Sequence, residues 1–172
     1  MDVGIRTLDG SDVVLPDDAL EQLRTSFHGR LLTRGAPGYD EARTIWNAMI
    51  DRRPSLIAQC TDANDVAAAV RFARENSLLT SVRGGGHNIA GNAVTDDGFM
   101  IDLSPMRSVI VDASARTARV GGGATLADVD KATQEHGLAT PLGINSTTGW
   151  RSISAARVPT AAKAPAPSGL RD

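Results

Sequence analysis

The sequence predicts an α+β fold, in which a strand–helix–strand (βαβ) subdomain precedes a second, mainly antiparallel subdomain. Between residues 55 and 82, an apolar run, a stretch with helical spacing and a second apolar run follow one another, which is the pattern of a βαβ unit with parallel strands. Two β-branched runs, at 109–111 and 117–120, flank Asp-Ala-Ser-Ala-Arg, which predicts an antiparallel hairpin. A glycine triplet then leads into the capped start of a helix.

The first 53 residues are expected to form an N-terminal helical segment. Pro16 can open a helix, and the two aspartates that follow it suit the positive end of the helix dipole. We expect helical character over 15–53, interrupted by the glycines of 35–38 and ended by Arg-Arg-Pro at 52–54.

Residues 54–149 carry the predicted βαβ subdomain and the hairpin. Strands are expected at 55–59, 78–82 and 99–103. Thr61 and Asp62 offer N-caps for the helix between the first two strands. The apolar positions of that helix recur at helical spacing: Val66, Ala69, Val70 and Ala73.

The last predicted helix runs from Thr125 to His136. Thr125 and Asp128 have the spacing of a capping box, and Gly137 suits the C-terminal cap. A loop rich in Gly, Thr and Ser follows, up to Gly149. Residues 150–172 are rich in Ala, Pro, Ser and Arg without an apolar period, which predicts a divergent, disordered tail.

The composition excludes several classes of function. The chain has 172 residues, 41% of them hydrophobic and 22% charged, as in an ordinary globular protein. A formal net charge of −2 without a basic block gives no support for nucleic-acid binding. One cysteine, Cys60, rules out a disulfide framework within the chain, and we expect it to be a small buried residue. No run has the length of a membrane span and no leader is recognisable, so we expect a cytoplasmic protein.

The loop at 80–92 is the feature most suited to chemistry. Arg83 and three consecutive glycines follow a predicted strand, and His87 and Asn88 come next. Glycines allow backbone N–H groups to approach a ligand, successive N–H groups bind anions, and an arginine suits phosphate. The alternative is a flexible turn with a surface histidine. The loop is neither a Gly-x-Gly-x-x-Gly fingerprint nor a Walker loop, because no helix opens directly after it and no Lys-Ser or Lys-Thr follows.

An ordered series of short motifs runs along the chain: Arg53-Pro54, Thr61-x-x-Asn64-Asp65-Val66, Arg83-Gly-Gly-Gly-His87-Asn88, Ile101-Asp-Leu-Ser104, Ala118-x-Val120-x-x-Gly123-Ala124 and Gly137-Leu-Ala-Thr-Pro141. With this series, over about 20–149, the chain resembles the FAD-binding domain of the berberine bridge enzyme-like FAD-linked oxidoreductases, within the vanillyl-alcohol-oxidase superfamily. The resemblance implies FAD as cofactor, a small-molecule substrate, and hydride transfer from an alcohol, amine or sugar carbon to flavin, with oxygen as acceptor.

The resemblance also assigns site residues. His87 matches the histidine that bonds covalently to the 8α-methyl group of the flavin, and such a link is expected to raise the reduction potential. The other cofactor-binding residues that it implies are Arg83, Gly84, Gly85, Gly86, Asn88, Gly123, Thr140, Pro141, Gly143, Thr147 and Gly149. Some members carry a second link through a cysteine, where this chain has Asn145, so a bicovalent flavin is not expected. His28 and His136 match nothing and are expected to be structural or solvated.

After Trp150 the match to the family ends. We therefore expect 54–149 to be an incomplete FAD-binding domain, without the substrate domain or a catalytic base, and we name no catalytic residue. Three hypotheses stay open at this point: an FAD-dependent oxidoreductase, a truncated flavin-binding fragment without turnover, and a superfamily member that holds FAD without a covalent bond. The sequence does not indicate an oligomeric state.

Overall fold

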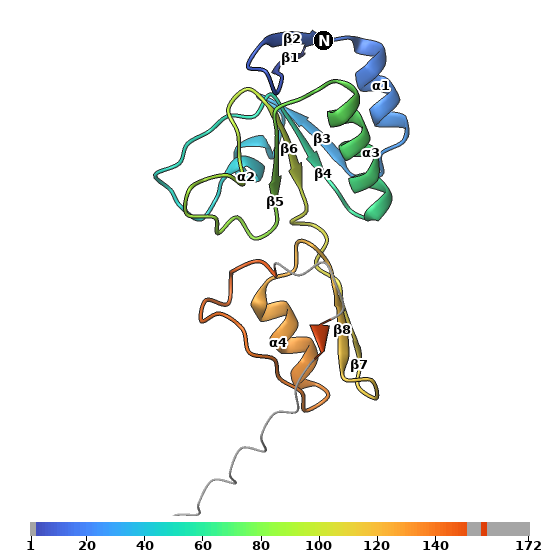
Figure 1. Ribbon diagram of the computed structural model, residues 1–172, viewed down its shortest axis with the longest axis vertical. Coiled ribbons are helices and arrows are strands. Elements are labelled where there is room, and N and C mark those ends of the chain that lie inside the picture. The colour runs from blue at the N-terminus through green and yellow to red at the C-terminus, as the bar shows by residue number, and fades with distance from the viewer. Residues whose placement is uncertain (1–2, 151–155, 158–172) are drawn as a thin grey trace, which may run out of the picture.

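The computed structural model describes residues 3–150 and 156–157, which form two lobes (Figure 1). The N-terminal lobe, residues 3–103, contains strands β1 to β6 and helices α1 to α3. The C-terminal lobe, residues 104–150 and 156–157, contains β7, β8, β9 and α4. This is the expected α+β architecture, with a subdomain built on a largely parallel sheet and a second, antiparallel one.

The N-terminal lobe is built on a four-stranded sheet in the order β3-β4-β6-β5. Its strands are β3 (Arg30–Thr33), β4 (Leu56–Gln59), β5 (Thr80–Arg83) and β6 (Phe99–Asp102). β6 lies in the centre and pairs in parallel with β4 and β5, whereas β3 runs antiparallel to β4 at one edge. The predicted βαβ unit is therefore confirmed, with β6 inserted between its two strands.

Helices cover both faces of this sheet because successive strand residues point to opposite faces. Leu56 and Phe99 pack with α1 (Asp17–Thr25) and α3 (Ala63–Glu75) in one core cluster. Their neighbours Ile57 and Met100 pack on the other side against α2 (Tyr39–Arg43) and the segment after it. Burial on both faces explains why these strands are continuous apolar runs. The cap of α3 is as predicted, since the Asp62 carboxylate accepts hydrogen bonds from two backbone N–H groups of the first turn.

Within 15–53, the prediction of helix is right for α1 and α2, the predicted break at 35–38 is present, and the remaining residues are not helical. β1 (Val3–Arg6) and β2 (Asp12–Leu15) form an antiparallel hairpin, and β3 lies between the two helices. The two adjacent leucines of β3 fit a helical turn as well as a strand, so its pairing with β4 decides its conformation. β3 and β4 lie on either side of the domain boundary expected at residue 53, so their pairing places both segments in one sheet.

The C-terminal lobe confirms the predicted hairpin and helix. β7 (Val109–Asp112) pairs antiparallel with β8 (Thr117–Val120). α4 (Leu126–Gln134) begins with the capping box of Thr125 and Asp128, and Gly137 follows the helix with φ +64°.

The predicted disordered tail falls mostly on 151–155 and 158–172, which lie outside the described residues. Ala156–Arg157 is described and forms strand β9 beside β8, so for these two residues the prediction is wrong. Within the described part of the chain, none of the helices is both long enough and apolar enough to cross a bilayer.

Candidate cofactor-binding site

A cleft of about 520 Å³ lies where the two lobes meet. The N-terminal lobe contributes β5 and the loop that follows it. The C-terminal lobe contributes its glycine triplet, 121–123, and residues 145–149, which we call the segment before Trp150. The described residues that line the cleft are Thr80, Ser81, Val82, Gly84, Gly85, Gly86, His87, Asn88, Asn92, Ala93, Leu103, Gly122, Thr148, Gly149 and Trp150. The predicted glycine loop thus forms one wall.

The glycines of this loop allow three loops to meet. A Cβ atom on Gly84 would lie 2.7 Å from the carbonyl oxygen of Gly122, and one on Gly85 would overlap the backbone of Gly149. Gly86 has φ +71°, a backbone conformation that other residues rarely adopt. The sequence suggested that glycines admit a ligand. In the structure, the first two are required by the contact between the lobes.

His87 is held on two sides at the edge of the cleft. Its Nε2 lies 2.9 Å from Thr147 Oγ1, and its ring stacks on Trp46 with centroids 5.2 Å apart and planes at 24°. The backbone N–H of Trp46 also donates to the carbonyl of Gly86 over 3.2 Å. The segment after α2 therefore supports the glycine loop from outside, a contact that no sequence pattern indicated.

The segment before Trp150 is attached to the N-terminus of α4. The N–H groups of Leu126 and Ala127 donate to the carbonyls of Thr148 and Ser146, over 2.9 and 3.0 Å. The protein's own carbonyls thus use helix N–H groups that could otherwise bind an anion. Asp128 closes the capping box, and its hydrogen bond from Arg107 lowers its pKa to about 2.

Arg83 faces the protein interior as well as the loop. Its Nη1 donates to the carbonyl of Ala42 over 2.6 Å and lies 3.5 Å from a carboxylate oxygen of Asp102, which is fully buried. Its charge therefore compensates a buried carboxylate. The expected contact of Arg83 with phosphate stays a prediction.

Three buried polar atoms in this region have no hydrogen-bond partner among the described residues: Ser81 Oγ, Arg83 Nε and Trp150 Nε1. Two of these residues, Ser81 and Trp150, line the cleft. An unpaired buried donor costs about 1 to 3 kcal/mol, so such groups indicate a site where a bound acceptor completes the hydrogen bonding.

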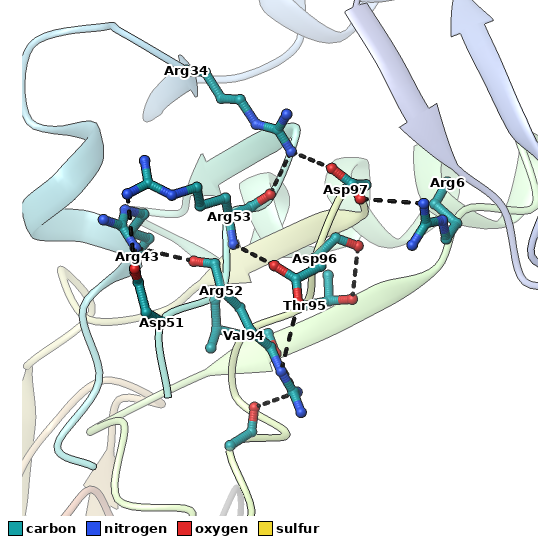
Figure 2. Close-up of polar contacts among 11 residues, drawn as sticks. Arg6, Arg34, Arg43, Asp51, Arg52, Arg53, Val94, Thr95, Asp96 and Asp97 are labelled. Atoms are coloured by element: carbon teal, nitrogen blue, oxygen red, sulfur yellow. Dashed lines mark hydrogen bonds and ion pairs between the residues drawn. The ribbon is translucent and has the colours of Figure 1, made fainter. Parts of the chain in front are cut away.

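The loop between β5 and β6, residues 84–98, is anchored at its far end by arginines and aspartates (Figure 2). Arg52 Nη1 donates to the carbonyls of Gly91 and Val94, each over 3.0 Å. Asp97 lies between Arg6 and Arg34 and pairs with both. The Arg53 N–H donates to Asp96 over 2.8 Å. These contacts fix the second half of the loop and leave its first half facing the cleft.

The predicted site residues are brought together in part. Gly84, Gly85, Gly86, His87, Asn88 and Gly149 line the cleft, and Thr147 reaches it through His87. The described lining does not include Gly123, Thr140, Pro141 or Gly143. Their roles toward a cofactor stay predictions. Sequence reasoning placed Ser81 in the 80–92 loop without giving it a role, and it missed Trp150 and Trp46. The tryptophans are the only two in the chain, but nothing in the local pattern linked Trp46 to His87 or Trp150 to the cleft.

Cys60 and His28, which were not expected to bind the cofactor, contact only other parts of the protein among the described residues. Cys60 is fully buried, and burial raises the pKa of its thiol to about 12, which makes it unreactive. His28 lies beside the cap of α3, with Nδ1 3.2 Å from a carboxylate oxygen of Asp62. Its backbone N–H donates to the buried Asp65 over 2.7 Å.

The chain belongs to the FAD-binding domain family, whose model matches residues 54–155. It is 40% identical over 125 residues to (R)-6-hydroxynicotine oxidase of Paenarthrobacter nicotinovorans, covering 73% of this chain and 27% of that protein. Two solved structures have TM-scores of 0.69: Physcomitrella patens BBE-like 1 (26% identity, 76% of this chain and 29% of that one) and the grass pollen allergen Phl p 4, with glucose dehydrogenase activity (31% identity, 77% and 30%). The chain thus spans under a third of the length of these relatives.

The residues of the cleft fit the cofactor of this family. FAD presents an anionic diphosphate and a flavin edge with carbonyl acceptors. The unpartnered hydroxyl of Ser81 and indole N–H of Trp150 are donors, as are the backbone N–H groups of the glycine loop. Apolar side chains of Val82, Ala93 and Leu103 complete the lining, as in most cofactor sites.

Proposed function

We propose that this chain holds FAD in the cleft between its lobes, with the diphosphate at the loop Gly84–Asn88 and a covalent bond from His87 to the 8α-methyl group of the flavin. The observation that carries the proposal is the position of His87. It lies in the lining of the cleft beside the glycine loop, and two contacts hold its ring there. The remaining predicted residues (Arg83, Gly123, Thr140, Pro141, Gly143, Thr147 and Gly149) would support the loop or contact the rest of the cofactor.

The whole protein would be an FAD-dependent oxidoreductase acting on a small molecule. A bound flavin would accept a hydride from an alcohol, amine or sugar carbon, with oxygen as final acceptor. The names of two relatives, a hydroxynicotine oxidase and an allergen with glucose dehydrogenase activity, support the amine and sugar classes. In this chain, the glycine loop would bind the diphosphate, and the covalent bond would retain the cofactor and raise its reduction potential.

A second candidate, flavin binding without turnover by this chain alone, is favoured by one observation. Among the described lining residues, His87 is the only one with an ionisable side chain. If His87 is bonded to flavin, the described lining offers no other proton acceptor for a substrate. A non-covalent FAD site of the same superfamily is the third candidate, and the same experiment tests it.

The test is the visible spectrum of the purified chain before and after acid precipitation. We expect flavin absorbance that stays with the pellet in the wild-type protein and moves to the supernatant in His87→Ala. Release of flavin from the wild type would mean that FAD is bound without a covalent bond, as in the third candidate. A chain that never takes up FAD would contradict the proposal. Turnover of added alcohols, amines or sugars by this chain would eliminate the second candidate. The cytoplasmic location stays a prediction, which fractionation of the producing cells would test.

A further inference from the structure

Asn145 and Thr147 form a hydrogen-bonded chain that ends on His87. The backbone N–H of Thr147 lies 3.0 Å from Asn145 Oδ1, and the Thr147 hydroxyl lies 2.8 Å from the same atom. The hydroxyl oxygen of Thr147 is in turn 2.9 Å from His87 Nε2. Asn145 and Thr147 lie at the surface of the segment before Trp150, whereas His87 is half-buried.

The number of donors fixes the position of each proton in this series of hydrogen bonds. The backbone N–H of Thr147 needs an acceptor, so the amide atom of Asn145 beside it is oxygen, which only accepts. The hydroxyl of Thr147 has a single proton, and that proton must point at this oxygen. The lone pairs of the hydroxyl then face His87, so Nε2 of the ring must be the donor.

The proton on Nε2 determines the state of the other ring nitrogen of His87, Nδ1. A neutral imidazole carries one proton, and the hydrogen bond made by one nitrogen sets the state of the other. With the proton on Nε2, the free lone pair lies on Nδ1. Stacking on Trp46 limits tilting of the ring, so this lone pair has a defined direction.

We propose that Asn145 and Thr147 are positioning residues that hold His87 in the tautomer with the proton on Nε2, which makes Nδ1 the nucleophile of the covalent attachment. The inference rests on the proposed function. It assigns to Asn145, through its contacts with Thr147, a role in preparing the bond at His87.

The attachment balances as follows. The lone pair of Nδ1 forms a bond to the 8α carbon, and one C–H bond of the methyl group breaks and releases a proton. The Nε2 proton, held toward Thr147 until the bond has formed, is released next. Two electrons remain on the flavin, and dioxygen takes them together with the two protons to give hydrogen peroxide. Thr147 and Asn145 bond to no atom of the cofactor in this step.

The first measurement is made on the chain free of FAD. Nitrogen-15 NMR of labelled histidine reports which ring nitrogen is protonated, and the His87 signal is identified by its loss in His87→Ala. We expect the Nε2–H tautomer to dominate in the wild type and in Thr147→Ser, which keeps the hydroxyl. In Thr147→Val the tautomer ratio should shift roughly fivefold, as expected for the loss of one hydrogen bond. A dominant Nδ1–H tautomer in the wild type, or an unchanged ratio in Thr147→Val, would overturn the inference.

The second measurement follows covalent incorporation of added FAD by in-gel flavin fluorescence, and mass spectrometry identifies the peptide containing His87. We expect Thr147→Val to slow incorporation roughly five- to tenfold, with Thr147→Ser and Asn145→Asp within about twofold of the wild type. Two-dimensional NMR of the flavin peptide should locate the bond on Nδ1. A bond on Nε2, or wild-type rates in Thr147→Val, contradicts the positioning role and leaves the proposed function standing. A wild type that binds no FAD contradicts the proposed function, while the tautomer measurement still decides the inference.

Discussion

The two halves of the β5–β6 loop are held in place in opposite ways. The first half, 84–90, contacts neighbouring loops through glycine backbone and presents His87 and Asn88 to the cleft. The second half, 91–98, is fixed by arginine side chains that bind its carbonyls and aspartates (Figure 2). The two halves therefore have different roles. The second half stabilises the loop, and because it is anchored, the first half can leave His87 and its backbone N–H groups available to a cofactor.

The largest effect on FAD affinity is expected from Gly85→Ala, which introduces a steric clash in the first half of the loop. The new Cβ would overlap the backbone of Gly149 and lie 3.2 Å from the Thr147 carbonyl, so the two lobes would have to separate locally. Overpacking of this kind costs about 1 to 3 kcal/mol, which corresponds to an FAD affinity roughly 5- to 150-fold weaker. The dissociation constant can be measured from quenching of flavin fluorescence in a His87→Ala background, where binding is reversible.

Gly4→Ala is the matched control for this variant. A Cβ on Gly4 has no neighbour within 4 Å, and its φ lies outside the left-handed region. We expect its FAD affinity to equal that of the parent. Equal affinity in Gly85→Ala would show that the contact between the glycine loop and the segment before Trp150 does not shape the site.

Arg52→Met tests the second half. The variant keeps the apolar stem of the side chain but removes the donors to the Gly91 and Val94 carbonyls. The free energy of unfolding should fall by about 1 to 2 kcal/mol, because these bonds are charge-assisted and partly buried. Urea unfolding measures the loss, and amide exchange should accelerate at 91–97. FAD affinity should change less than about threefold if the halves are independent.

Arg53→Met is the companion control. The Arg53 side chain is 56% exposed and lies 3.8 Å from Asp51, while its part in the loop contacts comes from its backbone N–H and carbonyl. We expect a loss below about 0.5 kcal/mol. Equal losses in the two variants would mean that a general reduction of positive charge, rather than the bonds of Arg52, is what destabilises the loop.

Among the variants that remove a contact of the loop, the smallest effect is expected from Asp97→Asn. Asp97 has φ 57°, which asparagine tolerates well, so the backbone should be kept while the charge is lost. Its pairs with Arg6 and Arg34 are partly exposed to solvent, and such pairs contribute about 0.5 kcal/mol. Thermal unfolding at low salt should detect the loss, and 1 M salt should remove the difference. A difference that persists in salt would assign the effect to hydrogen bonding instead.

Local signals in the sequence were enough to predict several elements. The cap of α3 at Asp62 and the capping box of α4 use residues two or three positions apart. The apolar runs of β4 and β6 are recognisable because both faces of the sheet are covered. β3 escaped prediction because its two adjacent leucines fit a helix as well as a strand, and the segment after α2 escaped because contacts with the β5–β6 loop shape it.

By itself, the sequence determined the α+β architecture, the place of the glycine loop after a strand and, through family resemblance, the cofactor. Only the tertiary structure decided that Gly84 and Gly85 serve the contact between lobes, that Arg83 compensates Asp102, and that Thr147 faces Nε2 of His87. The physical reason is distance along the chain. Periodicity and capping act over a few residues, whereas His87 and Thr147 are 60 positions apart and meet only when the two lobes come together.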